Sequence, residues 1–398
     1  MRLALLAVFF AFIDGSCTAQ PSSTASLPPP SGTHAVGTST FHLVDSTRTD
    51  FVQNASDAYR ELMVQVWYPA EDTEQEHQAP YVSTEDLLDI MKEDGYMDLA
   101  TNVIEGWRSL QIHAQTDAPF AQNIPPTGVL FFSHGLGLPR FHYTSLLQDL
   151  ASHGYIIVAI DHPYGGLMQL PDGRTLSSSQ DPADLNAPPV IAQRTHDWSA
   201  DASFVLDRIL SRQGLLGRFA QNINQDHVGM FGHSLGGSAA LEACINDSRF
   251  KACVTMDGAP FGKVEQTGIQ KPTLMLGSGP DYSDEDLAAL GRTREQWEQM
   301  GEQYMSVVES ILTLSVEHPG YLVSIKGTGH MSYSDAPFVM PETISRFGGR
   351  IIDPNRGFEI MTTYLRSFFD QYLLNQPGDL FQGNSERYPE VSVHVFNR

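Results

Sequence analysis

Basic residues, cysteines and long apolar runs are scarce in this chain of 398 residues, and each shortage excludes a class of protein. Only 24 Lys and Arg stand against 47 Asp and Glu, which gives a formal net charge of −23. A surface this acidic repels phosphate backbones, so nucleic acid is not an expected partner. The histidines show no metal-ligand spacing such as H-E-x-x-H, and the glycines form neither a phosphate loop nor a dinucleotide fingerprint. The sequence therefore predicts a protein without metal or cofactor.

The one apolar run that suggests a targeting segment lies at the N-terminus. Arg2 precedes an apolar stretch over residues 3–13, and Cys17-Thr18-Ala19 has the small-x-small pattern of a cleavage site. This predicts a signal peptide over residues 1–19 and a secreted or periplasmic protein; a lipoprotein anchored at Cys17 is the less favoured alternative. Residues 20–40 are rich in Ser, Thr and Pro and predict a flexible leader before a catalytic domain at 41–398.

The chain has only 3 cysteines, which leaves little room for disulfides. If cleavage follows Ala19, only Cys244 and Cys253 remain, across a predicted helix end and strand start. A disulfide would suit an oxidising compartment, but the sequence favours two buried free thiols.

Short apolar runs alternate with helical patterns through most of the chain. The runs are "ELMVQVWYP", which alternates, and "TGVLFFSHG", "GYIIVAIDH", "HVGMFGHS", "KACVTMDG", "KPTLMLGSG" and "GYLVSIKG", which are almost continuously apolar. The helical patterns cover residues 143–153, 195–210, 234–245, 284–312 and 358–374. Continuously apolar strands between helices predict an α/β fold with a mostly parallel central sheet flanked by helices. Residues 84–119, 165–189 and 281–319 fit the alternation poorly and are expected to form lid or pocket-wall inserts, with surface decoration as the alternative.

The stretch "GMFGHSLGG" places Ser234 between Gly232 and Gly236, after a predicted strand and before an Ala-rich helix. This G-x-S-x-G pattern in a strand–turn–helix setting is that of the nucleophile elbow of α/β-hydrolases. The elbow is so tight that side chains at the flanking positions would collide with the backbone, which explains the glycines. Ser234 is therefore the predicted nucleophile.

A serine nucleophile needs a base, and the base needs an orienting carboxylate. In this fold the base follows the serine in the chain. His330, in "IKGTGHMSYSD", follows the last predicted core strand and is the expected base. For the acid, Asp257 and Asp281 each follow a strand, and the pattern favours Asp257 because it stands directly at a strand's carboxyl end.

Two backbone N–H groups should stabilise the oxyanion of the transition state. One belongs to Leu235, directly after the nucleophile. The other comes from the loop after "VLFFSHGLG", where Leu136 is the expected donor. His134 in the same loop is expected to pack or hydrogen-bond locally rather than to react.

Four blocks, "FFSHGLGLPRFHYTSLLQDLASHGYIIVAIDHP", "GMFGHSLGG", "VTMDGAPFG" and "GTGHMSYSDAP", resemble the platelet-activating factor acetylhydrolase family. The resemblance covers about residues 64–374 and implies an α/β-hydrolase that cleaves esters without calcium. It implies phospholipids with short or oxidised sn-2 acyl chains, and other short-chain esters, as substrates. It also implies that the acid is Asp257, with Ser234 and His330 as nucleophile and base and with Leu136 and Leu235 as oxyanion donors.

These observations predict a secreted serine esterase or lipase that acts on a small-molecule or lipid ester, with contact to a lipid surface as a further expectation. A polyester, cutinase-like or general short-chain carboxylesterase is the first alternative. A hydrolase-fold binding protein without activity is the second, and the complete set of triad residues argues against it.

Overall fold

The computed structural model describes residues 26–50, 52, 58–72, 78–93, 96, 99, 101–122, 124, 127–185, 187–212, 216–314, 317–341 and 350–397. The predicted signal peptide and Cys17 lie outside these residues. Within them, eleven strands form one sheet, in the order β13-β12-β11-β10-β9-β5-β6-β2-β1-β4-β3. Its strands are β1 (Ala35–Thr49), β2 (Tyr59–Ala70), β3 (Gln78–Pro80), β4 (Gln111–Thr116), β5 (Thr127–Ser133), β6 (Ile156–Asp161), β9 (Ile223–His233), β10 (Ala252–Met256), β11 (Thr273–Gly279), β12 (Gly320–Lys326) and β13 (Val391–Phe396).

The centre of the sheet is parallel, as the continuously apolar runs predict. Strands β6, β5, β9, β10, β11 and β12 all pair in parallel. Antiparallel pairing begins at β2 on one side and at β13 on the other. The carboxyl ends of the parallel strands therefore meet at one edge, where ligands bind in open α/β sheets.

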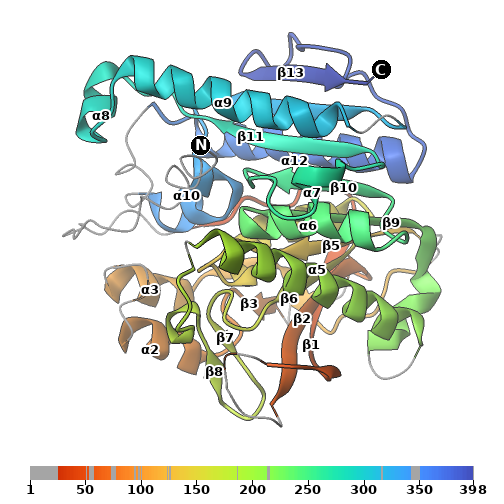
Figure 1. Cartoon of the computed structure of the whole chain (residues 1–398). Helices are drawn as coiled ribbons and strands as arrows, with labels where there is room; N and C mark the ends of the chain where they lie inside the picture. The colour runs from red at the N-terminus through yellow and green to blue at the C-terminus, as the bar shows by residue number, and fades with distance from the viewer. Residues whose placement is uncertain are drawn as a thin grey trace.

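Helices cover both faces of the sheet and create two cores. The helices are α2 (Glu85–Glu93), α3 (Thr101–Arg108), α4 (Thr144–Ser152), α5 (Pro188–Leu210), α6 (Leu235–Asn246), α7 (Val264–Thr267), α8 (Asp284–Ala289), α9 (Arg294–Leu312), α10 (Ala336–Val339) and α12 (Pro354–Leu373), with 3-10 turns η3 (Arg140–Tyr143), η4 (Ser178–Gln180), η5 (Leu216–Asn222) and η6 (His330–Tyr333). In Figure 1, α5 and α6 cover the near face and α12 lies behind the sheet. Along β5, Leu130 and Phe132 join the core with α4 and α12, whereas Val129 and Phe131 join the core with α5, α6 and α9. This alternation explains why a strand covered on both faces is apolar throughout.

The N-terminal segment differs from the sequence-based expectation. The flexible leader was expected to reach residue 40, but β1 begins at Ala35 and pairs with β2 over most of its length. Before it, Gly32 and His34 donate backbone hydrogen bonds to Ser152 at the end of α4. The leader is thus shorter than its composition indicates, because Thr38, Ser39 and Thr40 are strand residues between β2 and β4.

The insert over residues 281–319 is also not a single helix. It forms a short α8 and a longer α9, separated by Gly291 at φ 68°. Figure 1 shows α8 and α9 beside β11, at the end of the sheet opposite β1 and β2. The 84–119 stretch likewise holds α2, α3 and the strand β4, and the 165–189 stretch contains the hairpin of β7 (Met168–Gln169) and β8 (Thr175–Leu176).

The prediction of two free thiols is wrong in this structure, which joins Cys244 to Cys253 in a disulfide. Their Cα atoms are 6.5 Å apart, within the range that a disulfide can span. Cys244 lies near the end of α6 and Cys253 in β10, and these two elements pack together. Sequence spacing alone could not show that the returning strand brings the two sulfur atoms to the same side. None of the described helices is long and apolar enough to cross a membrane.

Candidate active site

Ser234 lies in a strained turn between β9 and α6. Its backbone has φ 54° and ψ −122°, a conformation that a residue with a side chain rarely adopts. Such strain is typical of functional positions, where the surrounding structure holds it in place. The N-terminus of α6 starts at the next residue, so its positive end faces negative charge that develops at Ser234.

The glycines around Ser234 are required by close backbone contacts. A Cβ atom on Gly232 would lie 2.2 Å from the carbonyl oxygen of Gly236, and one on Gly236 would lie 2.2 Å from that of Ser133. A Cβ on Gly237 would lie equally close to Thr255 Oγ1, at 2.2 Å. The structure thus explains the G-x-S-x-G-G pattern by the packing of β5, β9, β10 and α6 against one turn.

His330 and Asp257 form a hydrogen-bonded pair at the same edge of the sheet. His330 begins η6, shortly after β12, and its Nδ1 atom lies 2.7 Å from Asp257 Oδ2. Asp257 directly follows β10, and its other oxygen accepts the backbone N–H of Ser278 at 2.8 Å. The side chain of His330 is 26% exposed and that of Asp257 only 8%. A solvent-accessible imidazole is thus oriented by a buried carboxylate.

The ionisation of Asp257 fits this pairing. Burial raises the pKa of the Asp257 carboxyl group. The interactions with His330 and the N–H of Ser278 lower it by more than burial raises it, so the net pKa is below its usual value. Asp257 is therefore a carboxylate at neutral pH and accepts the His330 Nδ1–H.

The other candidate acid has different partners. Asp281 forms an ion pair with Lys326 at 3.5 Å and a strand-like bridge with Arg350. Because Asp257 is the carboxylate on His330 Nδ1, the geometry favours Asp257 over Asp281 as the orienting group.

The two expected oxyanion donors come from two segments that meet at Ser234: Leu235 directly follows it, and a Cβ atom on Gly135, next to Leu136, would lie 3.3 Å from Ser234 Cβ. Leu235 is the first residue of α6, and the first N–H groups of a helix have no partner within it. Leu136 lies in a tight turn closed by a hydrogen bond from Leu138 N to the Gly135 carbonyl, with Gly137 at φ 82°. In the described part of the chain the N–H of Leu136 donates no hydrogen bond. Both groups can therefore receive an anionic oxygen.

The structure also contains a second Ser-His-Asp array, which the sequence analysis missed. Ser133 Oγ lies 3.0 Å from His162 Nε2, and His162 Nδ1 lies 2.7 Å from Asp201 Oδ2. All three side chains are buried, with no more than 1% exposed. Their positions at the ends of β5 and β6 and within α5 carry no sequence pattern that would unite them.

Cations neutralise this second array. Arg60 donates two hydrogen bonds to Asp201, at 2.6 and 2.7 Å, and Arg48 donates a third at 2.7 Å. Burial raises the pKa of Asp201, but Arg60 and His162 together lower it by more, so that the net pKa is below its usual value. Burial is also the main reason that the pKa of His162 is lowered. The array is therefore a buried ion pair with a neutral histidine, and its Ser133 directly precedes residues 134–138, the oxyanion loop.

His134 behaves as the sequence analysis expects. Its Nδ1 atom lies 2.8 Å from the Gly135 carbonyl, and its Nε2 atom accepts the backbone N–H of His162. Burial lowers the pKa of His134 to about 3. It is a neutral, packed side chain.

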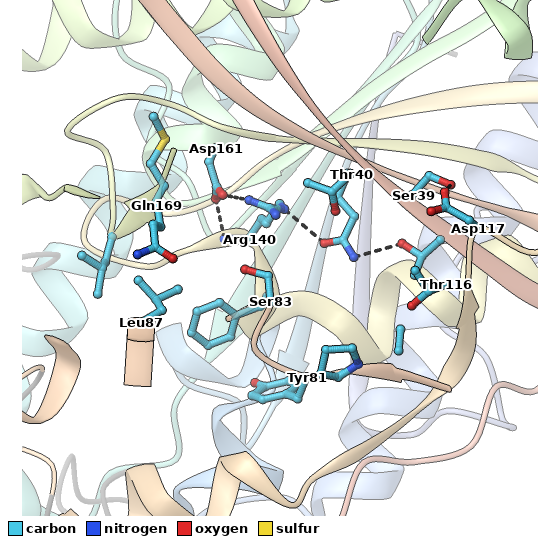
Figure 2. Close-up of a pocket in the computed structure, with 17 residues that line it drawn as sticks. Ser39, Thr40, Tyr81, Ser83, Leu87, Thr116, Asp117, Arg140, Asp161 and Gln169 are labelled. Carbon is cyan, nitrogen blue, oxygen red and sulfur yellow. Dashed lines mark hydrogen bonds and ion pairs between the residues drawn. The ribbon is translucent and has the colours of Figure 1, made fainter. Parts of the chain in front are cut away.

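A cavity of about 240 Å³ is lined by Arg140 and Asp161, among others, and Ser234 is not among its lining residues. A row of polar contacts crosses it, in which Arg140 pairs with Asp161 and donates to Gln65, and Gln65 donates to Thr38. Figure 2 shows Tyr81, Ser83 and Leu87 facing this row across the cavity. Of the described residues that line the cavity, none belongs to the candidate triad.

The α8–α9 insert approaches the candidate acid. Burial is the main cause of the raised pKa values of Tyr282 and Tyr304, and the negative charge of Asp257 also contributes to both. The ring of Tyr282 also packs edge-on against Trp297, with centroids 5.1 Å apart. The insert thus places aromatic side chains near the carboxyl ends of β10 and β11.

The sheet order, the helices on both faces and the strained serine after β9 define the class of the protein as an α/β-hydrolase. A solved structure of a ferulic acid esterase from Streptomyces cinnamoneus is similar over 93% of this chain and 99% of its own, with a TM-score of 0.71 and 28% identity. The class is therefore that of the carboxylic ester hydrolases.

The chain belongs to the platelet-activating factor acetylhydrolase family. A family model described as "Platelet-activating factor acetylhydrolase, isoform II" matches residues 19–164 and 202–387. The chain is 25% identical to a probable 1-alkyl-2-acetylglycerophosphocholine esterase of Arthroderma benhamiae, over 96% of this chain and 97% of that protein. It is 22% identical to the platelet-activating factor acetylhydrolase of Canis lupus familiaris, over 68% of this chain and 64% of that protein. The family expected from the four sequence blocks is confirmed.

Proposed function

We propose that this protein is a secreted serine esterase that removes short acyl chains from phospholipid-type esters through Ser234, His330 and Asp257. The observation that carries the proposal is the 2.7 Å hydrogen bond between His330 Nδ1 and Asp257 Oδ2, at the same edge of the sheet as the strained Ser234. Strain, an oriented imidazole and a buried carboxylate together are the requirements of serine-based acyl transfer.

In the acylation step, Ser234 Oγ attacks the ester carbonyl carbon while His330 Nε2 takes the hydroxyl proton. The carbonyl oxygen becomes an oxyanion, which accepts hydrogen bonds from the N–H groups of Leu136 and Leu235. The carbon–oxygen bond to the leaving group then breaks, and His330 returns the proton to the departing alcohol. Asp257 stabilises the imidazolium that exists between these two proton transfers.

In the deacylation step, water attacks the carbonyl carbon of the acyl-enzyme. His330 takes a proton from the water, a second oxyanion forms at the same two N–H groups, and the bond to Ser234 Oγ breaks. Ser234 regains its proton from His330, and a carboxylic acid leaves. No cofactor is required at either step.

The substrate class follows from the relatives. The Arthroderma relative is described as an esterase of 1-alkyl-2-acetylglycerophosphocholine, a phospholipid with an acetyl group. A ferulate-type ester is the second candidate, because the ferulic acid esterase fold covers nearly the whole chain and the insert brings Tyr282 and Trp297 near the acid. An aromatic acyl group could stack on the rings of Tyr282 and Trp297. Polyester or general short-chain ester hydrolysis remains the broader alternative.

The test is hydrolysis by the wild type and by Ser234→Ala of three substrate sets. These are p-nitrophenyl esters of graded acyl length, phosphatidylcholine with an sn-2 acetyl group, and methyl ferulate. We expect kcat/KM to fall with acyl length, to be highest for the acetyl phospholipid, and to vanish in Ser234→Ala. Ser179→Ala, which changes an exposed serine in η4, is the matched control. Full activity of Ser234→Ala would contradict the proposed mechanism, and preference for methyl ferulate would replace the proposed substrate.

Secretion rests on the N-terminal pattern and on the disulfide. A structural disulfide is typical of oxidising compartments, and the predicted cleavage site follows Ala19. N-terminal sequencing of the mature protein from the native host should begin at Gln20. An intact Met1 in the mature protein would exclude the signal peptide, and a lipidated N-terminal Cys17 would favour the lipoprotein. Vesicle co-sedimentation would test contact with a lipid surface.

A further inference from the structure

His233, the residue before the candidate nucleophile Ser234, connects the loop that contains Gly135 and Leu136 to the loop that contains His330. The side chain is completely buried. Its Nδ1 atom lies 2.8 Å from the Tyr143 hydroxyl, and its Nε2 atom lies 2.9 Å from the carbonyl oxygen of His330. The same Tyr143 hydroxyl accepts the backbone N–H of Gly135 at 3.0 Å. Three hydrogen bonds therefore run from the oxyanion loop to the backbone of the candidate base.

Only one arrangement of protons satisfies every member of this chain. The His330 carbonyl oxygen can only accept, so the neutral imidazole of His233 has its proton on Nε2 and donates it there. His233 Nδ1 is then an acceptor and takes the proton of the Tyr143 hydroxyl, whose oxygen in turn accepts the Gly135 N–H. Burial is the main reason that the pKa of His233 is well below its usual value, and the nearby His330 is the second. The imidazole is thus a neutral connector with one accepting and one donating end.

Packing leaves this connector little freedom. The ring centroids of His233 and His330 are 4.4 Å apart, and the ring of Tyr333 stacks on His233 at 6.2 Å. On the other side, a Cβ atom at Gly135 would lie only 2.9 Å from His233 Nδ1. A shift of His233 would therefore move both the oxyanion loop and the base.

A second pair of hydrogen bonds ties the same two regions together. The N–H of Asp335, five residues after His330, donates to the carbonyl of His142 at 2.6 Å. Asp335 Oδ1 in turn accepts the N–H of Ser145 at 3.1 Å, at the start of α4. These bonds fix the position of the loop after His330 at Asp335, whereas the hydrogen bonds through His233 reach the backbone of His330 itself.

We propose that His233 and Tyr143 act as one positioning unit, which sets the distance between the His330 base and the oxyanion donor Leu136 around Ser234. Neither residue touches the substrate or transfers a proton in the reaction. The proposal rests on the proposed function, because it assigns these residues to the same esterase site. Its physical basis is that acyl transfer requires the base and the oxyanion donors in a fixed geometry, and an error of about 1 Å costs about 100-fold in rate.

The test is a double-mutant cycle on Tyr143→Phe and His233→Phe, with p-nitrophenyl acetate as substrate. Each single variant should lower kcat by about 10- to 100-fold and change KM by less than about twofold, since ground-state binding does not need the exact geometry. The double variant should lose no more than the worse single variant, because both residues belong to one chain of hydrogen bonds. His233→Gln keeps an N–H donor for the His330 carbonyl and should recover part of the kcat lost in His233→Phe.

Tyr321→Phe is the matched control, because Tyr321 is a buried tyrosine whose hydroxyl hydrogen-bonds only to Tyr372 in the described residues. It should retain the kcat of the wild type. Thermal melting identifies any variant that is unfolded at the assay temperature, and Tyr143→Phe, which removes one oxygen atom, keeps the test available if His233→Phe does not fold. A kcat within twofold of the wild type in folded Tyr143→Phe, or fully additive losses in the double variant, would overturn the proposal. Ser234 dependence of the activity is measured separately, so a failure of the esterase mechanism would be distinguished from a failure of the positioning unit.

Discussion

The protein contains two Ser-His-Asp arrays that share the hydrogen bond between histidine and aspartate but differ in their surroundings. In both, a carboxylate accepts from histidine Nδ1 at 2.7 Å, in one pair Asp257 and His330 and in the other Asp201 and His162. In the first array the serine is Ser234, at φ 54° in a turn, whereas in the second it is Ser133, the last residue of a strand. The residue types are therefore the same in the candidate triad and in the second array.

Access and electrostatics make the difference. His330 is 26% exposed, but His162 is sealed from solvent and stacked on Trp198 with ring centroids 4.3 Å apart. Asp257 hydrogen-bonds to His330, while Asp201 also forms ion pairs with Arg60 and Arg48. An imidazolium beside two guanidinium groups gains little from its carboxylate, so a proton on His162 would be disfavoured. The comparison teaches that the two arrays differ in the access of solvent to the histidine and in the cations that surround the carboxylate.

The largest expected effect is on the serines. Ser234→Ala should lower kcat by about 10⁶-fold, as removal of a serine nucleophile does elsewhere. Ser133→Ala should leave kcat near the wild-type value and lower the free energy of unfolding by about 1–3 kcal/mol, because His162 Nε2 loses its buried partner. Steady-state kinetics and urea unfolding of both variants check this. Equal losses of activity in the two variants would remove the distinction between the arrays.

The carboxylate of the first array is the next test. Asp257→Asn should lower kcat by about 10⁴-fold, because an amide no longer holds the imidazole in the reactive tautomer. The melting temperature should change little by comparison. Asp281→Asn is the matched control, and it should keep most of the activity since Asp281 pairs with Lys326. The opposite ranking of the two variants would assign the acid to Asp281.

The carboxylate of the second array should behave in the reverse way. Asp201→Asn leaves the buried Arg60 without its charged partner, and loss of one member of a buried ion pair costs about 3–5 kcal/mol. Unfolding in urea measures this loss. Activity per folded molecule, calibrated by fluorophosphonate titration of the active serine, should be close to that of the wild type. A variant that is stable but inactive would show that the second array takes part in catalysis.

The smallest expected effect concerns Asp335, a buried carboxyl group that, unlike Asp201, has no cation among the causes of its pKa shift. Burial raises its pKa to about 7, although hydrogen bonds from Ser145 and Tyr81 oppose this. The folded protein thus holds a proton that the unfolded chain releases near pH 4, so stability falls as pH rises from about 4 to 7. Asp335→Asn should be more stable than the wild type by about 1 kcal/mol or more at pH 8 and should lose this advantage at pH 4. Urea midpoints at the two pH values measure it, and an equal difference at both would contradict the raised pKa.

Much of the fold was predictable because buried strands have a distinct composition. All seven apolar runs named from the sequence lie in or overlap strands, and the nucleophile turn follows one of them. The 15-residue β1 was missed, because its Ser- and Thr-rich sequence alternates between buried and exposed positions near the edge of the sheet. The β7–β8 hairpin and the strands β3, β4 and β13, at or next to the ends of the sheet, were missed for a different reason, because they are short and half-exposed.

The candidate site was predictable where a local backbone demand is written in the residues. Gly232 and Gly236 identify a turn that leaves no room for a side chain on either side of Ser234, and strand ends place Asp257 and His330 at one edge of the sheet. The long-range contacts were not predictable in this way. Tyr143, His162 and Asp201 lie in η3, after β6 and in α5, and nothing in their neighbours indicates a hydrogen bond to the active-site region.

By itself, therefore, the sequence determined the class of fold, the nucleophile turn and the family, because these depend on local periodicity and on glycines that the backbone requires. Only the tertiary structure decided which carboxylate pairs with His330, that Cys244 and Cys253 are joined, and which of two Ser-His-Asp arrays reaches solvent. Each of these depends on how separate elements pack across the sheet, and packing over such separations leaves no pattern in any single stretch of the chain.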